Sequence, residues 1–282
     1  MNTPAKYARV DPALAIASLF RPVTRGRRPR ALELVTEHDG LILTWRSFEY
    51  LDSRDQSVLY ACAALASIEK GGALHADAPG ETGQQLWLDL DPEERAVQDS
   101  AVAFDTTYYR ILAAAGFDDS AGSYKRLKDI LSRLSDVSIR AQREGYDWKM
   151  KLVSYAARPD GRISIAMNSR MAAALDGQHV NENLVERRQL HGDVAQIAHG
   201  RLCGWLRHGK AMTIGIDKLG AYIWGVDTSN PNTRRSRRNR TLKALDEVSE
   251  LEGWQVSVES GGAGSKATIR RAKLIESSQD PV

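Results

Sequence analysis

The chain has 282 residues, of which 42% are hydrophobic, and this is enough apolar material for two modest cores rather than one. The formal net charge is only +3, so the overall charge alone indicates no class of partner. The two cysteines, Cys62 and Cys203, lie far apart in the sequence, which fits a reducing cytoplasm and argues against a disulfide framework. No apolar run approaches the roughly 20 residues that span a bilayer, and the N-terminus lacks a signal-peptide pattern. We therefore expect a soluble cytoplasmic protein without a membrane partner.

Residues 1–30 are predicted to form a basic N-terminal arm, because residues 22–30 show neither a helical nor a strand period. The arginines of this segment are Arg21, Arg25, Arg27, Arg28 and Arg30. Two interpretations stay open. The segment is either a solvated, mobile lead-in or an arm that lies on a phosphate backbone through counterion release.

Residues 31–168 alternate between strand and helix signals. A hairpin with an Asp39-Gly40 turn is followed by a helix that Asp52 or Ser53 caps and that runs to Ile68. The later predicted elements are a strand at Gln85–Leu90, helices at Glu93–Phe104 and Thr106–Ala115, a longer helix capped by Ser123, and strands at Val137–Gln142, Trp148–Ala156 and Arg162–Met167.

The remaining chain repeats the order of helices followed by a hairpin. The predicted elements are helices at Met171–Leu175, Val194–Leu206 and Ile216–Tyr222, an arginine-rich helix from Thr233 that Gly253 closes, and strands at Trp254–Glu259 and Lys266–Arg271. We expect an α+β fold of two tandem winged-helix domains, at residues 31–168 and 169–275, with a tail at 276–282. The first domain could serve in dimerisation or in a secondary DNA contact.

The arginine-rich helix is the strongest functional signal in the sequence. Between Arg234 and Lys243 there are five arginines and one lysine and no acidic residue. With Leu242 and Leu245 facing the core, three side chains point outward and one lies at the edge of that face; these candidates for base or groove contacts are Ser236, Arg240, Lys243 and Arg237. The candidates for phosphate contacts are Arg234, Arg235 and Arg238.

A run of charge is more often only a solvated helix face. Two arguments weigh against that alternative here. Uncompensated arginines repel one another, and the dipole at a helix N-terminus disfavours cations but favours a bound anion such as phosphate. The hairpin that follows adds Lys266, Arg270 and Arg271, either as backbone contacts or as the polar face of an edge hairpin.

The sequence contains no catalytic or cofactor motif that withstands inspection. Ser265 occupies the position where a phosphate-binding loop needs lysine, and the histidines and cysteines lack zinc-ligand spacing. Asp89 and Asp91 could suggest a nuclease, but residues 91–94 are more simply a helix start with acids in its first turn. We therefore expect no enzyme activity, no metal and no cofactor.

Several segments together resemble the replication initiator protein C (RepC) of IncQ-type plasmids. The most specific are the runs 201–210 and 216–224, the arginine-rich helix, and Gly253-Trp254; weaker similarity extends to residues 11–13, 19–21, 109–112, 128–142 and 161–168. The loop at residues 206–208 and the tail after Lys273 differ from the family pattern.

The resemblance implies a plasmid initiator with two winged-helix domains. Such proteins, the TrfA-like initiators included, bind repeated iterons at an origin, open adjacent AT-rich DNA and help to recruit the plasmid helicase and primase. They can also form homodimers and repress their own expression. By position, the DNA-binding residues are the basic ones of the helix at residues 234–243.

A winged-helix transcriptional repressor is the main alternative, since its basic helix and hairpin would have the same sequence signature. The two-unit layout favours the initiator, because one unit can dimerise while the other reads DNA. A recombinase or nuclease would need a catalytic constellation that the sequence lacks.

Overall fold

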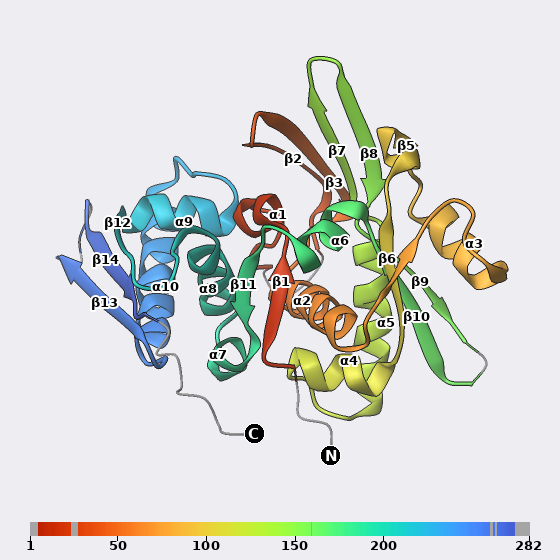
Figure 1. Ribbon diagram of the computed structural model, residues 1–282. Helices are drawn as coiled ribbons and strands as arrows, with labels where there is room; N and C mark the ends of the chain where they lie inside the picture. The colour runs from red at the N-terminus through yellow and green to blue at the C-terminus, as the bar shows by residue number, and fades with distance from the viewer. Residues whose placement is uncertain (1–4, 24–27, 159, 260–261, 263, 274–282) are drawn as a thin grey trace.

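The computed structural model describes residues 5–23, 28–158, 160–259, 262 and 264–273. Helices and strands are interspersed, so the fold is α+β, and Figure 1 shows two lobes. Each lobe has its own hydrophobic core, one running from Ala5 to Leu184 and the other from Leu190 to Ile269. We refer to residues 5–184 as the first unit and residues 190–273 as the second unit.

The division between the cores falls later than the predicted boundary at residue 168. Helix α6 (Ser169–Asp176) packs against the first unit, where Met171 and Leu175 join its core. Strand β11 (Val180–Asn183) and helix α7 (Leu184–Gln189), which have no counterpart among the predicted elements, then lead to the second unit.

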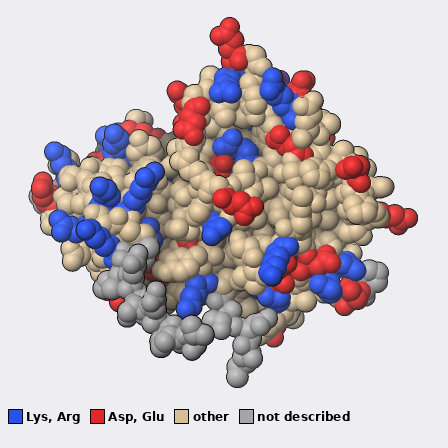
Figure 2. Space-filling view, viewed as in Figure 1, with Lys and Arg blue, Asp and Glu red and all other residues tan. Residues whose placement is uncertain are grey.

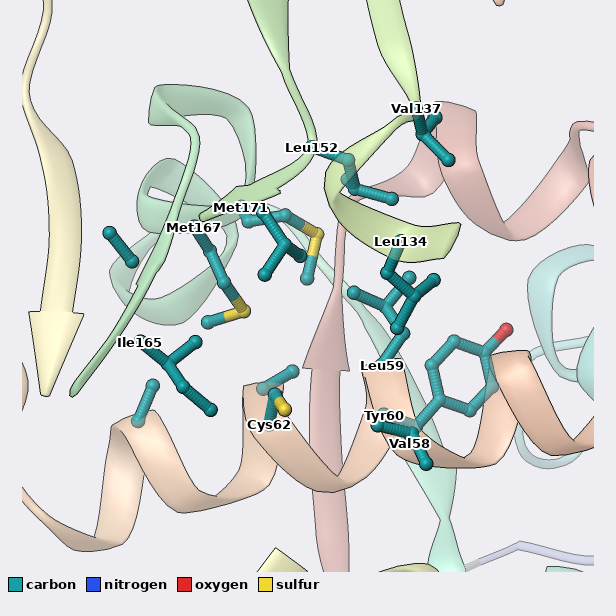
Figure 3. Close-up of a cluster of buried hydrophobic side chains, with 14 of the residues drawn as sticks. Val58, Leu59, Tyr60, Cys62, Leu134, Val137, Leu152, Ile165, Met167 and Met171 are labelled. Carbon is teal, nitrogen blue, oxygen red and sulfur yellow. The ribbon is translucent and has the colours of Figure 1, made fainter. Parts of the chain in front are cut away.

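Helix α2 (Ser53–Ile68) is the central element of the first unit. Asp52 caps it, and the side chains of Asp52 and Asp55 accept hydrogen bonds from each other's backbone N–H groups. The helix is buried on nearly all sides from Asp55 to Ala66, as expected for a helix surrounded by other elements. Figure 3 shows its side chains among those of the helix and strands around it, including Leu134 and Met167.

The two units share one topology. In the first unit the order is α2, β6 (Ala101–Thr107), α4 (Tyr108–Ala115), α5 (Ala121–Ser135), β9 (Val153–Ala157) and β10 (Arg162–Met167). In the second unit it is α8 (Asp193–Trp205), β12 (Ala211–Gly215), α9 (Ile216–Trp224), α10 (Pro231–Ser249), β13 (Trp254–Glu259) and β14 (Lys266–Arg271). The antiparallel strand orders β6-β10-β9 and β12-β14-β13 are the same when each set is numbered along the chain. The predicted repeat is present, although its first helix is α2.

The first unit also carries insertions. A second sheet has the order β2-β3-β7-β8-β5, and a short strand β4 (Gly72–Leu74) extends the β6 sheet. The members of this second sheet are β2 (Arg30–His38), β3 (Leu41–Glu49), β5 (Glu93–Glu94), β7 (Ser138–Arg143) and β8 (Tyr146–Lys151). The β2–β3 hairpin turns at Asp39-Gly40 as predicted, and Figure 1 shows that it and the β7–β8 hairpin project from the first unit.

Four local predictions in the first unit are wrong. Residues 85–89 lie in helix α3 (Gly80–Asp89), with Leu90 as its C-cap, rather than in a strand, because Leu86 and Leu90 are buried while Leu88 between them is exposed. Residues 93–104 form β5, a 3-10 turn (η1, Arg95–Gln98) and the start of β6, whose pairing with β10 overrides local helix propensity. Residues 148–156 are divided between β8 and β9, which belong to different sheets. In addition, Ser120 rather than Ser123 caps α5.

The prediction of an N-terminal arm is wrong for residues 5–23. Strand β1 (Tyr7–Val10) pairs with β11, and helix α1 (Pro12–Ile16) packs against α8, so Figure 1 shows this segment between the two lobes. Strand β1 escaped prediction because four residues are too few to establish a period. Arg28 makes ion pairs with Asp52 and Asp55 instead of remaining available to phosphate. Arg25 and Arg27 lie outside the described residues.

Candidate nucleic-acid interface

Helix α10 begins two residues before the predicted start. The Asn230 side chain accepts hydrogen bonds from the backbone N–H groups of Asn232 and Thr233, at 3.0 and 3.1 Å, and Pro231 takes the first helical position. The residues that face the core are Thr241, Ala244, Leu245 and Val248, spaced by three and four. The helix ends at Ser249 with Glu250 as its C-cap, so the prediction that Gly253 closes it is wrong; Gly253, with φ at +81°, lies in the turn that leads to β13.

Most of the predicted contact residues lie on the surface of α10. The exposed members are Arg234, Arg235, Ser236, Arg240 and Lys243, while Arg237 and Arg238 are half-buried. Figure 2 shows Lys and Arg side chains gathered on the lobe that contains α10 and the β12–β14 sheet. The outward direction predicted for Ser236, Arg240 and Lys243 is therefore present in the structure.

Trp224, the last residue of α9, supports two of these arginines. The guanidinium carbon of Arg237 lies 5.4 Å from the centre of the Trp224 ring, and that of Arg240 lies 5.3 Å from it. Arg237 also donates a 2.8 Å hydrogen bond from Nη1 to the Val226 carbonyl. A guanidinium stacked on an aromatic face still presents N–H groups at its edge, so this arrangement pre-orients both side chains for an anion or a base.

Neighbouring helices supply acids that residues 234–243 of α10 lack. Arg238 forms a two-point ion pair with Asp217 of α9, with N–O distances of 2.8 and 2.5 Å, and the hydrogen bonds that it donates to Asp217 raise the pKa of Arg238. Asp193 of α8 lies 3.3 Å from Arg240, which remains 46% exposed. Arg234 donates to the Thr228 carbonyl at 2.7 Å. Of the predicted phosphate ligands, Arg238 is thus the one most strongly engaged within the protein.

The β13–β14 hairpin presents two of its three predicted contacts. Lys266 and Arg270 are exposed on β14. Arg271 is only 4% exposed: its guanidinium lies 4.9 Å from the centre of the Trp254 ring and 3.7 Å from Glu186. The assignment of Arg271 to DNA is therefore wrong. Strand alternation places residue 271 on the same face as the buried residue Ile269. Residues 260, 261 and 263 of the hairpin turn lie outside the described residues.

A buried polar cluster next to this sheet contains the three potential metal ligands Glu182, His199 and Cys203. Both ring nitrogens of His199 already face carboxylates, Nδ1 at 2.9 Å from Glu182 and Nε2 at 2.8 Å from Glu186. The Cys203 sulfur lies 3.9 and 3.7 Å from these nitrogens, so it rests against the ring. A zinc ion would instead lie off one nitrogen at about 2.0 Å. The geometry therefore fits an imidazolium held between two carboxylates.

Electrostatics in this cluster agree with that assignment. Burial alone would lower the pKa of His199, but Cys203 and Glu182 outweigh burial and hold the pKa well above its usual value. Glu186 also accepts a hydrogen bond from Trp254 Nε1 at 2.9 Å. The cluster therefore connects the segment between the units to the β13–β14 hairpin, and its role is structural.

Sequence reasoning missed the groups that orient or neutralise the basic helix. Trp224 and Asp217 belong to α9, and Arg21 and Tyr50 of the first unit line a cleft against the start of α10. An aromatic residue directly before Gly225 was visible in the sequence, but its position under two arginines depends on how α9 packs against α10.

The chain is similar to a known protein family and to solved structures. The model of the family described as Replication protein C (RepC) matches residues 3–273. Crystal structures of domains 2 and 3 of RctB are similar in fold at 12% sequence identity: one has a TM-score of 0.57 and coverage of 93% of this chain and 99% of the other. A second has a TM-score of 0.51 and coverage of 93% and 97%. No curated protein matches the chain. Within the described residues, no helix is long and apolar enough to cross a membrane.

Proposed function

The chain belongs to the replication protein C (RepC) family, and we propose that it initiates plasmid replication by binding iteron repeats at the origin. The exposed arginine row of α10, held in part against Trp224, is the observation that carries this proposal. The major groove of DNA admits one α-helix, and arginine reads guanine through two hydrogen bonds. In this proposal Arg237, Arg240, Ser236 and Lys243 face the groove.

Phosphate contacts come from the remaining exposed cations. Arg234 and Arg235 lie at the start of α10, and Lys266 and Arg270 lie on the exposed face of β14. Both units are winged helices in this proposal, which the shared order of three helices and three strands supports. Binding would position the second unit on duplex DNA, and the first unit would be left to dimerise or to make a secondary contact.

The finer steps follow from the initiator role. We place the protein in the cytoplasm, where it opens adjacent AT-rich DNA and helps to recruit the plasmid helicase and primase. It performs no chemistry and needs no cofactor for these steps. Specific binding to repeats holds several copies side by side on one duplex, and DNA opening depends on that assembly rather than on an active site.

A salt-titrated binding assay tests the proposal directly. The protein is mixed with duplex from its own plasmid origin and, separately, with a scrambled duplex of equal length. With about six phosphate contacts, affinity should fall roughly 10³-fold between 50 and 200 mM salt. Equal affinity for the two duplexes would contradict the iteron-binding proposal.

Arg237→Ala and Arg240→Ala assign the base contacts. Each should cost about 1–3 kcal/mol on origin DNA and relax sequence preference, because a base-reading side chain distinguishes sequences. An equal loss on both duplexes would show that the two arginines hold only phosphate.

A transcriptional repressor with the same helix and hairpin is the second candidate function. Permanganate reactivity of thymines next to the repeats separates the two, since only an initiator leaves unpaired thymines there. Binding to repeats without any such reactivity would favour the repressor.

A further inference from the structure

A cleft of about 570 Å³ separates the start of α10 from the first unit. The first unit contributes Arg21 and Tyr50 to its walls, and the second unit contributes Trp224, Ser236, Arg237 and Arg240. The described residues that line the cleft include three arginines and no Asp or Glu. The cleft thus concentrates positive charge at the seam between the two units.

Arg21 is fixed in this cleft by several independent contacts. Its residue is only 5% exposed, its Nε donates a 2.8 Å hydrogen bond to the Ser18 carbonyl, and its guanidinium lies 5.1 Å from the centre of the Tyr50 ring. Gly225 passes directly beside it with φ at +69°, and a Cβ there would collide with the guanidinium. The second unit therefore leaves room at this point for an arginine of the first.

Arg21 is the least solvated of the cleft arginines, and Arg237 is partly shielded from water. Burial lowers the pKa of both Arg21 and Arg237, which means that their charges have lost favourable contacts with water. Arg201, itself buried, lies near enough to Arg21 to repel its charge. Arg240 already faces Asp193 at 3.3 Å, but an anion in the cleft would replace the lost solvation of Arg21 and Arg237, which a neutral ligand would not.

We infer that this cleft binds a phosphate group of the DNA backbone, next to the duplex held by α10, so that one strand crosses the seam between the two units. This inference rests on the proposed function, because Arg237 and Arg240 belong both to the cleft and to the groove-facing row. The planar guanidinium forks match phosphate oxygens, and Ser236 lies beside them on α10. A strand held there would fix the relative orientation of the two units.

Ethylation interference on origin DNA tests the inference one phosphate at a time. The variant Arg21→Gln removes the cleft charge contributed by the first unit. Arg235→Gln is the matched control, because Arg235 is exposed on α10 and does not line the cleft. Arg21→Gln should abolish interference at one backbone phosphate, reduce the slope of log affinity against log salt by about one, and leave sequence preference intact. Arg235→Gln should remove a different phosphate.

Tyr50→Leu serves as a second variant if Arg21→Gln lowers the melting temperature. It keeps the charge of Arg21 but removes the ring beneath the guanidinium, so interference should weaken at the same phosphate. An interference pattern unchanged by both variants would overturn the inference. Wild-type protein without preference for origin DNA would instead refute the proposed function, so the two failures are distinguishable.

Inorganic phosphate alone identifies the source of the ligand. If the cleft binds a backbone phosphate, millimolar inorganic phosphate should raise the melting temperature only slightly. The rise should be the same for the wild-type protein and for Arg21→Gln. A clear rise that Arg21→Gln removes, together with an unchanged interference pattern, would mean that the cleft takes free phosphate and would overturn the DNA assignment.

Discussion

Helices α5 and α10 occupy the same place in two units of one topology, but they carry their charges differently. On α10, five arginines and a lysine fall between residues 234 and 243 without an acid in the helix segment. On α5, Asp129 interrupts the basic residues, Arg133 turns inward to the buried Asp55 at 2.8 Å, and Arg126 lies 3.8 Å from Asp118. The two units therefore share a scaffold but not a charge pattern. The proposed difference in their roles rests on how the charges of the third helix, α5 or α10, are paired.

The insertions widen this difference. In the second unit α10 passes to β13 within a short turn, whereas in the first unit the β7–β8 hairpin intervenes between α5 and β9. The hairpin joins β3 and extends the second sheet. The first unit therefore presents a broad sheet beside α5, and the second presents an open basic helix.

The largest expected effect comes from the segment that both units share. Deleting residues 1–17 removes β1 and α1, including the fully buried Val10 and the buried Leu14, each of which contributes about 1.5–3 kcal/mol. Thermal denaturation should show a large loss of stability in both units. Tyr7→Ser, at an exposed position of the same strand, should be nearly neutral. A truncated protein with the melting temperature of the wild type would show that the segment is a mobile arm after all.

The next effect separates the two third helices. Replacing Arg234, Arg235, Arg237 and Arg240 with Gln should lower the salt slope of origin binding by about 2, because Arg234 and Arg235 are the proposed phosphate contacts among them and each adds about 0.9. The matched variant replaces Lys125, Arg126 and Lys128 of α5 with Gln and should change the slope by less than about 1. Equal losses would show that both units contact DNA and would erase the proposed difference in role.

A smaller effect concerns the buried cluster between the units. The pKa of His199 is raised in the folded protein, so its stabilising contribution is complete below the unfolded pKa of about 6.5 and is lost as pH rises through the folded pKa. Wild-type melting temperature should therefore decline above neutral pH, and His199→Gln should flatten that decline. The charged and titratable groups around it are Glu182, Glu186, Cys203, Arg187 and Arg271. An identical pH profile for the variant would contradict the imidazolium assignment.

The smallest expected effect is a gain. Asp217→Asn removes the carboxylate that engages Arg238 and should strengthen binding to random duplex by less than about 1 kcal/mol, the usual range for a partly exposed ion pair. Fluorescence anisotropy at low salt would detect it. Weaker binding by the variant would mean that Asp217 positions Arg238 for DNA rather than withholding it.

Local signals explain what the sequence predicted well. In the second unit the sequence predicts α8, α9, α10 and the β13–β14 hairpin but not β12, because apolar periods define the helices and the hairpin without help from distant residues, whereas β12 is a strand through its pairing with β14. The exposed row on α10 followed from the same period. The burial of Arg271 is predictable too, since alternation along β14 places it on the same face as Ile269 despite its charge.

The remaining features depend on contacts between distant segments. Strand β6 is a strand because β10 pairs with it, and β1 is a strand because β11 does. Arg21 and Tyr50 become part of the α10 surface only when the two units meet. A single sequence contains no local trace of such meetings, so the cleft could not be predicted from it.

The ribosome makes strand β1 long before it makes the partner strand β11. Tyr7 bonds in register with Asn183, more than 170 residues later in the chain. At the usual 5–20 residues per second, a ribosome needs roughly 10 to 35 s to make the partner strand after it has made the first. During that interval the apolar residues Ala8 and Val10 have no strand beside them. Helix α2, which also packs against β1, is made much earlier, so β1 has a helix to pack against well before its partner strand exists.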